Sequence, residues 1–335
     1  MARLGEILQI GFLSMFFAEI LTASSAFWFL NPWGWFVTYP LYLVHTVFLF
    51  NIGKRLKLKK ISQYYLLGTI FGLYESWITK VLWSGYGSGM RKAILGEYWG
   101  IAIFEFSILV FFYHPIFSFL LPLVSYQILE KFNEGNSIFT ISMNYTPSRK
   151  GILFLILCFF FSTSLFVNNN QFNLVNMTGS LFGSLLLIFV MNRILKRKDN
   201  PYNQSHLIVG RRGMMVMSAY LILLYSVTFV FLEPQYIPEI QGYIPILIAY
   251  LIPIIVLAIV KIKNPVEIPE NTRSFTSKTL KLVIIAYLLM VIVFTLIPGI
   301  TIIVATAAQI ICLVLGPILY ILMIISSLSR KISSE

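Results

Sequence analysis

Long apolar runs recur along the whole chain, and this feature limits the possible folds more than any other. About ten runs are each long enough to cross a hydrocarbon core of about 30 Å as a helix. They lie at 8–30, 35–52, 62–84, 99–125, 151–167, 174–192, 214–232, 243–260, 282–298 and 302–325. The runs lack the polar faces of a soluble helical core, and charged residues make up only 11% of the chain. We therefore predict an all-α, polytopic transmembrane helical bundle of about ten spans.

Basic residues are segregated to one side of this predicted topology. Of the 25 Lys and Arg residues, Arg91 and Lys92 fall in loops on one side and Lys80 lies inside a span, while the rest lie on the other side. The positive-inside rule then places both termini in the cytoplasm of a multi-pass protein of the cell membrane. The net charge of +12 is typical of contact with anionic lipid head groups at the cytoplasmic face rather than with nucleic acid. The sequence names no protein partner.

Ionisable residues inside the predicted spans are confined to the first four spans. This asymmetry predicts a four-span polar module at 1–125, a cytoplasmic connecting loop at 126–150 and a six-span apolar helical scaffold at 151–335. A charge at the centre of a bilayer costs about 2.5–3.5 kcal/mol, so such residues usually face a partner or a water-filled cavity. The candidate substrate- or proton-binding residues are Glu19, His45, Glu75, Lys80, Glu105 and His114.

Two alternatives bear on how these residues are used. Lys80 and Glu105 are both expected in the outer third of neighbouring spans, so they could pair with each other. Ion pairs and hydrogen bonds of this kind also hold membrane helices together without any other function. The structural interpretation therefore stays open beside the functional one.

The third span carries the densest group of polar and small residues. Gly68 and Gly72 form a small-xxx-small pair, which permits close approach of another helix. One turn later, Glu75 shares a helix face with Thr79. Glu75 and Lys80 are five residues apart, so they point in different directions and each needs a partner on another span.

Other features of the chain give no clear sign of chemistry. Cys158 and Cys312 both fall in apolar runs without metal-ligand spacing, and we expect neither a metal site nor a cofactor. His206 falls in a predicted cytoplasmic loop, where we expect a solvated surface residue. The glycine-rich stretch at 84–89 lacks the Gly-Lys-Ser/Thr ending of a phosphate-binding loop.

One motif resembles a known family. Glu75 and Ser76 are followed by Lys80, and His114 lies on the next span. This spacing resembles the first two motifs of the CAAX-protease and bacteriocin-processing membrane family, Glu-Glu-x-x-x-Arg and Phe-x-x-x-His. Here the second glutamate is Ser76, the arginine is Lys80, the phenylalanine is Val110, and no later span supplies the histidine of the third motif. The resemblance, over roughly 60 residues, implies a degenerate and non-proteolytic member.

Three functional hypotheses follow. The favoured one is that the protein handles a solute or protons through the polar groups of the first four spans, as many carriers do. The alternative is a degenerate intramembrane hydrolase of the CAAX-protease type, in which Glu75 is the catalytic base that activates a water, assisted by His114 and His45. The third is a non-catalytic subunit of a membrane complex. A carrier needs polar groups reachable from both sides, whereas an enzyme needs a pocket that opens to one side.

Overall fold

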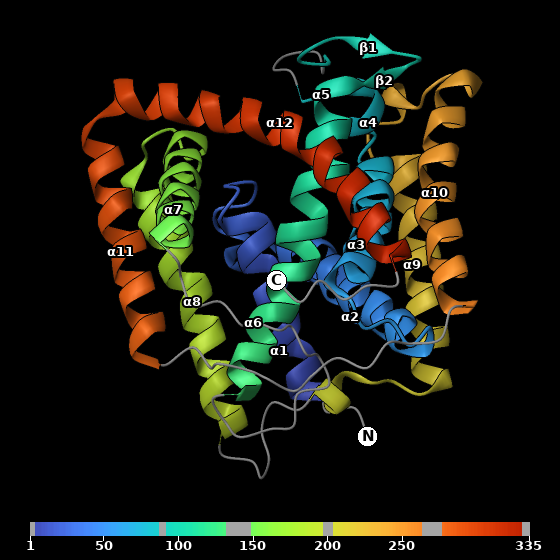
Figure 1. Ribbon diagram of the computed structural model, residues 1–335, viewed down its shortest axis with the longest axis horizontal. Helices are drawn as coiled ribbons and strands as arrows, with labels where there is room; N and C mark the ends of the chain where they lie inside the picture. The colour runs from blue at the N-terminus through green and yellow to red at the C-terminus, as the bar shows by residue number, and fades with distance from the viewer. Residues whose placement is uncertain (1–3, 87–91, 132–148, 197–203, 263–276, 330–335) are drawn as a thin grey trace. The chain divides into compact units, whose positions relative to one another are not determined.

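The computed structural model (Figure 1) describes residues 4–86, 92–131, 149–196, 204–262 and 277–329. This part of the chain is helical apart from one two-stranded hairpin, so the predicted all-α class is confirmed. The predicted connecting loop at 126–150 lies outside the described residues for most of its length, as do Gly87 to Gly89 of the glycine-rich stretch.

The α-helices cover most of the predicted spans. They are α1 (Leu4–Met15), α2 (Tyr39–Arg55), α3 (Ile61–Ile78), α4 (Val81–Ser84), α5 (Ile103–Glu105), α6 (Leu121–Lys131), α7 (Arg149–Asn169), α8 (Leu174–Lys196), α9 (Arg211–Phe231), α10 (Tyr243–Ile262), α11 (Ser277–Leu296) and α12 (Pro298–Leu328). Wider π-helical segments are η1 (Phe16–Ile20), η3 (Gly34–Thr38) and η4 (Phe106–Leu120). Short 3-10 turns are η2 (Trp28–Leu30), η5 (Gln204–Leu207), η6 (Pro234–Tyr236) and η7 (Ile240–Gly242).

Six helical stretches in the described residues are long and apolar enough to cross a membrane. They are Gly34–Arg55, Ile103–Tyr126, Leu174–Leu195, Arg211–Phe231, Ile240–Val260 and Pro298–Leu328. Burial divides them into two kinds, because the first two are 56% and 61% buried inside the protein while the other four are only 17–22% buried. The exposed stretches carry large apolar side chains outward, as lipid-facing helices do.

The chain forms two compact units that are interleaved along the sequence. Unit 1 comprises 1–43, 122–208 and 269–311, and unit 2 comprises 44–121, 209–268 and 312–335. These units reflect which segments pack together, whereas the polar module at 1–125 was predicted from the distribution of ionisable residues. The module therefore stays a prediction.

In unit 1, α1 packs against α8 and α7 packs against α11 (Figure 1). Two glycines of α8 leave room for aromatic side chains. A Cβ at Gly179 would lie 2.5 Å from the ring of Phe27, and a Cβ at Gly183 would lie 2.1 Å from the ring of Phe29. Any larger residue at either position would therefore collide with these rings.

In unit 2, α3 packs along η4, and α9 and α10 also contact α3. The predicted close approach at Gly68 and Gly72 is found at the crossing with η4. A Cβ at Gly68 would lie 2.7 Å from the Cα of Pro115, and one at Gly72 would lie 3.2 Å from the Cα of Val110. The two helix backbones meet here because neither glycine carries a side chain.

The structure corrects the ends of two predicted spans. The first helix ends at Ile20 rather than near residue 30, because Ala23 adopts a left-handed conformation (φ 60°) and the amides of Ser24 and Ser25 turn back to the carbonyl of Glu19. The fourth span begins at 103 rather than 99. Before it lies the hairpin of β1 (Glu97–Tyr98) and β2 (Ile101–Ala102), whose turn has positive φ at both central residues.

The short stretch Pro298-Gly299-Ile300 between the last two apolar runs predicts a tight hairpin, and the structure shows that this prediction is wrong. These residues form the first turn of α12, with Pro298 at the position where proline suits a helix start. Only Ile297 separates α11 from α12, whereas an antiparallel pair needs a loop of about two to five residues. The first half of α12 accordingly leaves α11 in a different direction (Figure 1).

Candidate functional site

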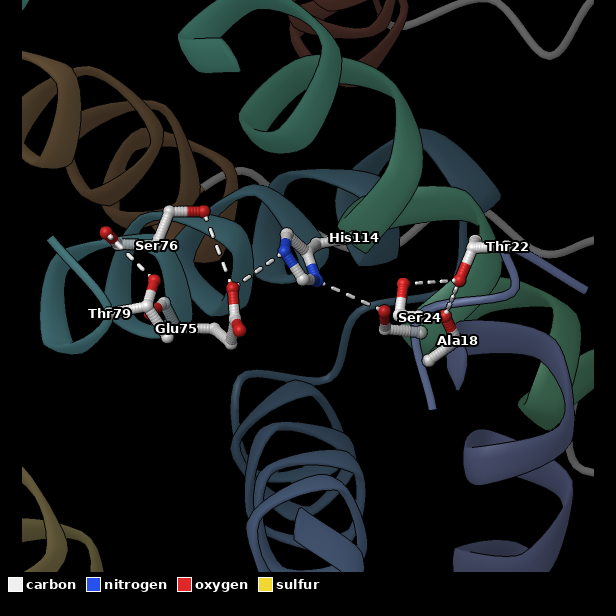
Figure 2. Close-up of polar contacts among 8 residues, drawn as sticks. Ala18, Thr22, Ser24, Glu75, Ser76, Thr79 and His114 are labelled. Atoms are coloured by element: carbon white, nitrogen blue, oxygen red, sulfur yellow. Dashed lines mark hydrogen bonds and ion pairs between the residues drawn. The ribbon is translucent and has the colours of Figure 1, made fainter. Parts of the chain in front are cut away.

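A carboxylate and an imidazole from two different helices meet in unit 2. Glu75 Oε2 of α3 lies 2.8 Å from His114 Nε2 of η4, an ion-pair distance (Figure 2). The side chains are 12% and 8% exposed, respectively. The sequence singled out both residues as candidates, and the structure brings them into contact.

The helix crossing positions this pair. A Cβ at Gly72 would lie 3.1 Å from the Cβ of His114, so the histidine stem lies directly on the bare backbone of α3. Glu75 follows Gly72 by almost one helical turn and therefore lies on the same side of α3. The glycine that allows the close approach also brings His114 within reach of Glu75.

The helix that carries His114 is unusual. η4 is a π-helical segment, a form that is rare and mostly limited to single turns near functional sites. Pro115 follows His114 directly and has no backbone N–H to donate. In the preceding turn, the hydroxyl of Tyr65 on α3 donates to the carbonyl of Phe111. The Tyr65 hydroxyl of α3 thus supplies a hydrogen-bond donor to a backbone carbonyl in the turn before the proline.

Hydroxyl groups extend the pair on both sides. His114 Nδ1 lies 3.1 Å from Ser118 Oγ, one turn along η4. On α3, Ser76 Oγ lies 3.5 Å from Glu75 Oε2 at the limit of a hydrogen bond, and Thr79 Oγ1 donates to the Glu75 carbonyl at 3.1 Å (Figure 2). Groups with exchangeable protons thus lie in a row from Ser118 to Ser76, in which His114 Nε2 and Glu75 are at ion-pair distance without the alignment of a hydrogen bond.

His45 of α2 lies beside the same group. Its ring stacks on Phe71 with the centroids 4.5 Å apart, and the ring of Tyr74 meets it edge-on at 4.3 Å. The Phe71 ring also contacts His114, at 5.7 Å. The structure therefore brings together three of the predicted site residues, namely His45, Glu75 and His114.

Lys80 does not join this group of residues, and its ammonium lies at the C-terminal end of α9. Its side chain is fully buried, and Nζ donates to the carbonyl of Leu232 and, at 3.4 Å, to that of Thr228. The ammonium also lies 5.2 Å from the centroid of the Phe229 ring. A cation at the carbonyl end of a helix complements the helix dipole, so these contacts describe a cap.

Glu105 holds the backbone of the loop that precedes it. Its Oε1 accepts the amides of Tyr86 at 3.1 Å and Ile94 at 3.2 Å. The suggested pairing of Lys80 with Glu105 is therefore wrong, because backbone groups take the place of each as partner. Glu19 is buried in η1 and belongs to unit 1.

Two residues with buried polar contacts were not predicted as candidate site residues. Ser118 lies four residues after His114, a spacing that could have indicated a shared helix face. His206 was expected to be solvated, and this is wrong: it is buried, and its Nδ1 lies 2.8 Å from Oε1 of the fully buried Glu6. No sequence signal joins these two, because Glu6 lies at a helix start far away along the chain.

In the described part of the chain no three His, Cys, Asp or Glu side chains come together in a way that could hold a metal ion.

Several helices long and apolar enough to cross a membrane, in a chain with only 11% charged residues, are typical of a polytopic integral membrane protein. The sequence profile of a family described as "Uncharacterized membrane protein family" matches residues 8–332, and the chain belongs to this family. An "Uncharacterized protein" from Archaeoglobus fulgidus is 42% identical over 121 residues, which cover 35% of this chain and 36% of the relative. No solved structure matches. These matches lend no support to the resemblance to the CAAX-protease family, which stays a hypothesis.

Proposed function

We propose that the protein carries protons, coupled to the movement of a polar solute, through a site built on Glu75 and His114. The observation that carries this proposal is the 2.8 Å contact between the two side chains. A carboxylate and an imidazole at this distance can share or exchange a proton. Each proton gained or lost changes the charge of the pair by one unit, in surroundings where charge is costly.

The neighbouring groups support this role. Ser118 and Ser76 flank the pair and offer hydroxyl groups that both donate and accept. His45 adds a second imidazole on the Phe71 ring. Lys80 and Glu105 serve the proposal only indirectly, through the helix end and the loop that they hold.

The setting of the site is part of the proposal. We place the protein in the cell membrane with both termini in the cytoplasm, because the basic loops fall on one side. These loops would contact anionic lipid head groups at that face. Protease access to tags at either terminus in oriented vesicles tests the placement.

Reconstitution into proteoliposomes with a pH-sensitive dye inside tests the proton pathway. Under an imposed pH gradient we expect proton flux in the wild type and its loss in Glu75→Gln and His114→Gln. Glu97→Gln is the matched control, because Glu97 is exposed on β1 and should leave the flux unchanged. Equal flux in all four proteins, or none in the wild type under any gradient, overturns the proposal.

A serine hydrolase, which differs from the water-activating hydrolase expected from the sequence, is a second candidate favoured by one observation, the position of Ser118. Its hydroxyl, His114 and Glu75 form a series in which a nucleophile meets a base that a carboxylate orients. An enzyme of this kind would be labelled on Ser118 by a fluorophosphonate probe. Labelling that disappears in Ser118→Ala and in Glu75→Gln supports catalysis, whereas unlabelled wild type counts against a serine nucleophile.

A further inference from the structure

A second acid–base pair lies in unit 1, among residues outside the site described above. Glu6 of α1 accepts from two sides, with its Oε1 2.8 Å from His206 Nδ1 of η5 and its Oε2 bonded by the hydroxyl of Tyr126 of α6. Glu6 and Tyr126 are fully buried and His206 is 9% exposed. Three segments that are distant in sequence thus converge on one carboxylate.

An unusual amide lies next to this carboxylate along α1. Gln9 is fully buried, and within the described part of the protein neither its Nε2 nor its Oε1 has a hydrogen-bond partner. Gln9 follows Glu6 by three residues, so the two side chains are neighbours on the helix surface. Leaving a buried polar group unpaired costs about 1–3 kcal/mol, and a buried water is the usual partner in such a place.

We propose that Glu6 and His206 bind a second transported proton, and that a water held by the Gln9 carboxamide delivers it. The inference rests on the proposed proton-carrying function and assigns a further binding site to it. The proton arrives on water as hydronium, passes to the carboxylate–imidazole pair and is later released from the pair to water. Only O–H and N–H bonds form and break, and the pair gains one positive charge while the proton is bound.

Few charged side chains are described on the elements that pack against α1 around the Glu6–His206 pair. α1 packs against α8 and η5, and the chain continues into η1. Of the side chains that the structure describes, α8 adds Arg193, which lies over the ring of Phe189 on its own helix at 5.6 Å. η1 adds Glu19, about 20 Å from Glu6 along the helix axis at 1.5 Å per residue. Tyr126 on α6 and His206 on η5 lie in direct hydrogen-bond contact with Glu6.

A direct measurement is possible because the protein has only three histidines. Labelling them with 15N gives three imidazole spin systems, each assigned by a His→Gln variant in lipid nanodiscs. Imidazole nitrogen shifts report protonation across about pH 5 to 8, the range in which histidine responds. We expect the His206 signals to respond to pH, and Glu6→Gln to change that response while the His114 signals stay as in the wild type.

Glu75→Gln is the matched control and should show the reverse pattern, changing His114 and sparing His206. Signals from His206 that ignore pH, or that are identical in the wild type and Glu6→Gln, overturn the second site. If Glu6→Gln fails to fold, Glu6→Asp keeps the charge and shortens the side chain, and its His206 response must still differ from that of the wild type.

Flux separates this inference from the proposed function. We expect Glu6→Gln to lower proton flux in proteoliposomes roughly ten-fold or more, on the scale of a lost proton-transfer group. Absence of flux in the wild type removes the proposed function and leaves the histidine signals readable. Normal flux in Glu6→Gln removes the second proton while leaving Glu75 and His114 in place.

Gln9→Met tests the delivery of the proton by water. Methionine has a similar length and no polar group, so it removes the partner of the water without changing Glu6 or His206. We expect solvent exchange of the His206 Nδ1–H to slow by roughly ten-fold, with its equilibrium protonation unchanged. Exchange at the wild-type rate overturns the role of Gln9.

Discussion

Gly72 of α3 lies against His114 of η4 so closely that a Cβ on the glycine would come within 3.1 Å of the histidine Cβ. The close contact at Gly72 therefore sets the distance between α3 and η4 at His114. Because Glu75 is less than one turn away on α3, the packing of the glycine and the 2.8 Å acid–base contact depend on each other.

Enlarging Gly72 should separate the pair. We expect Gly72→Ala to be tolerated with a small loss of stability and Gly72→Leu to destabilise the fold by about 1–3 kcal/mol, as overpacking does, and to lose proton flux. Unfolding in denaturing detergent and dye-monitored flux measure the two effects. Gly299→Ala is the control, since nothing lies within 4 Å of a Cβ there. Full flux in Gly72→Leu would show that the site does not need this spacing.

Tyr65 should stabilise the helix around Pro115. Tyr65→Phe keeps the ring but removes the hydroxyl that donates to Phe111, so we expect a loss of about 0.5–1.5 kcal/mol. Tyr98→Phe, which changes an exposed ring on β1, should have no effect. Denaturation curves of both variants give the comparison, and equal stability would mean that the bond contributes nothing.

Lys80 should matter for stability more than for flux. Lys80→Met leaves the carbonyl of Leu232 without the ammonium donor, while that of Thr228 keeps the amide of Leu232, at an expected cost of about 1–3 kcal/mol. Flux per folded molecule should stay near that of the wild type, because the ammonium caps α9. Loss of flux in a variant that is as stable as the wild type would instead make Lys80 part of the proton path.

Glu105 should control the order of the loop backbone that it holds. In Glu105→Ala the amides of Tyr86 and Ile94 lose their acceptor. Hydrogen exchange at these two amides should become faster by roughly ten-fold or more, equal to about 1.4 kcal/mol of lost protection. Amides of α10 serve as the internal reference, and unchanged exchange at Tyr86 and Ile94 would contradict the assigned role.

The sequence was a good guide to the helices and a partial guide to the site. Apolar runs define spans because backbone groups in lipid must be paired inside a helix, and the small-xxx-small pair at Gly68 and Gly72 identified a real crossing. Glu75 and His114 were singled out by the cost of burying them. Their contact could not be predicted, because it depends on which helix packs against which.

The failures have a common physical origin. Depth in the membrane suggested that Lys80 would pair with Glu105, but backbone carbonyls and amides compete with side chains for both groups. Loop position suggested a solvated His206, but η5 folds onto α1 and buries it against Glu6. The sequence pattern shows which segments are polar, but it does not show which atoms become hydrogen-bond partners in the fold.

The interleaving of the two units has a consequence for how the protein is made. Residues 269–311 complete unit 1, and residues 312–335, translated after them, complete unit 2. Glu75 and His114 leave the ribosome early, yet η4 receives the close contact of Gly316 at Ser107 and the stacking of Tyr320 on Phe111 only when α12 has been synthesised. Insertion of the early helices therefore precedes assembly of unit 2, and a chain that stops before α12 leaves one side of η4 uncovered.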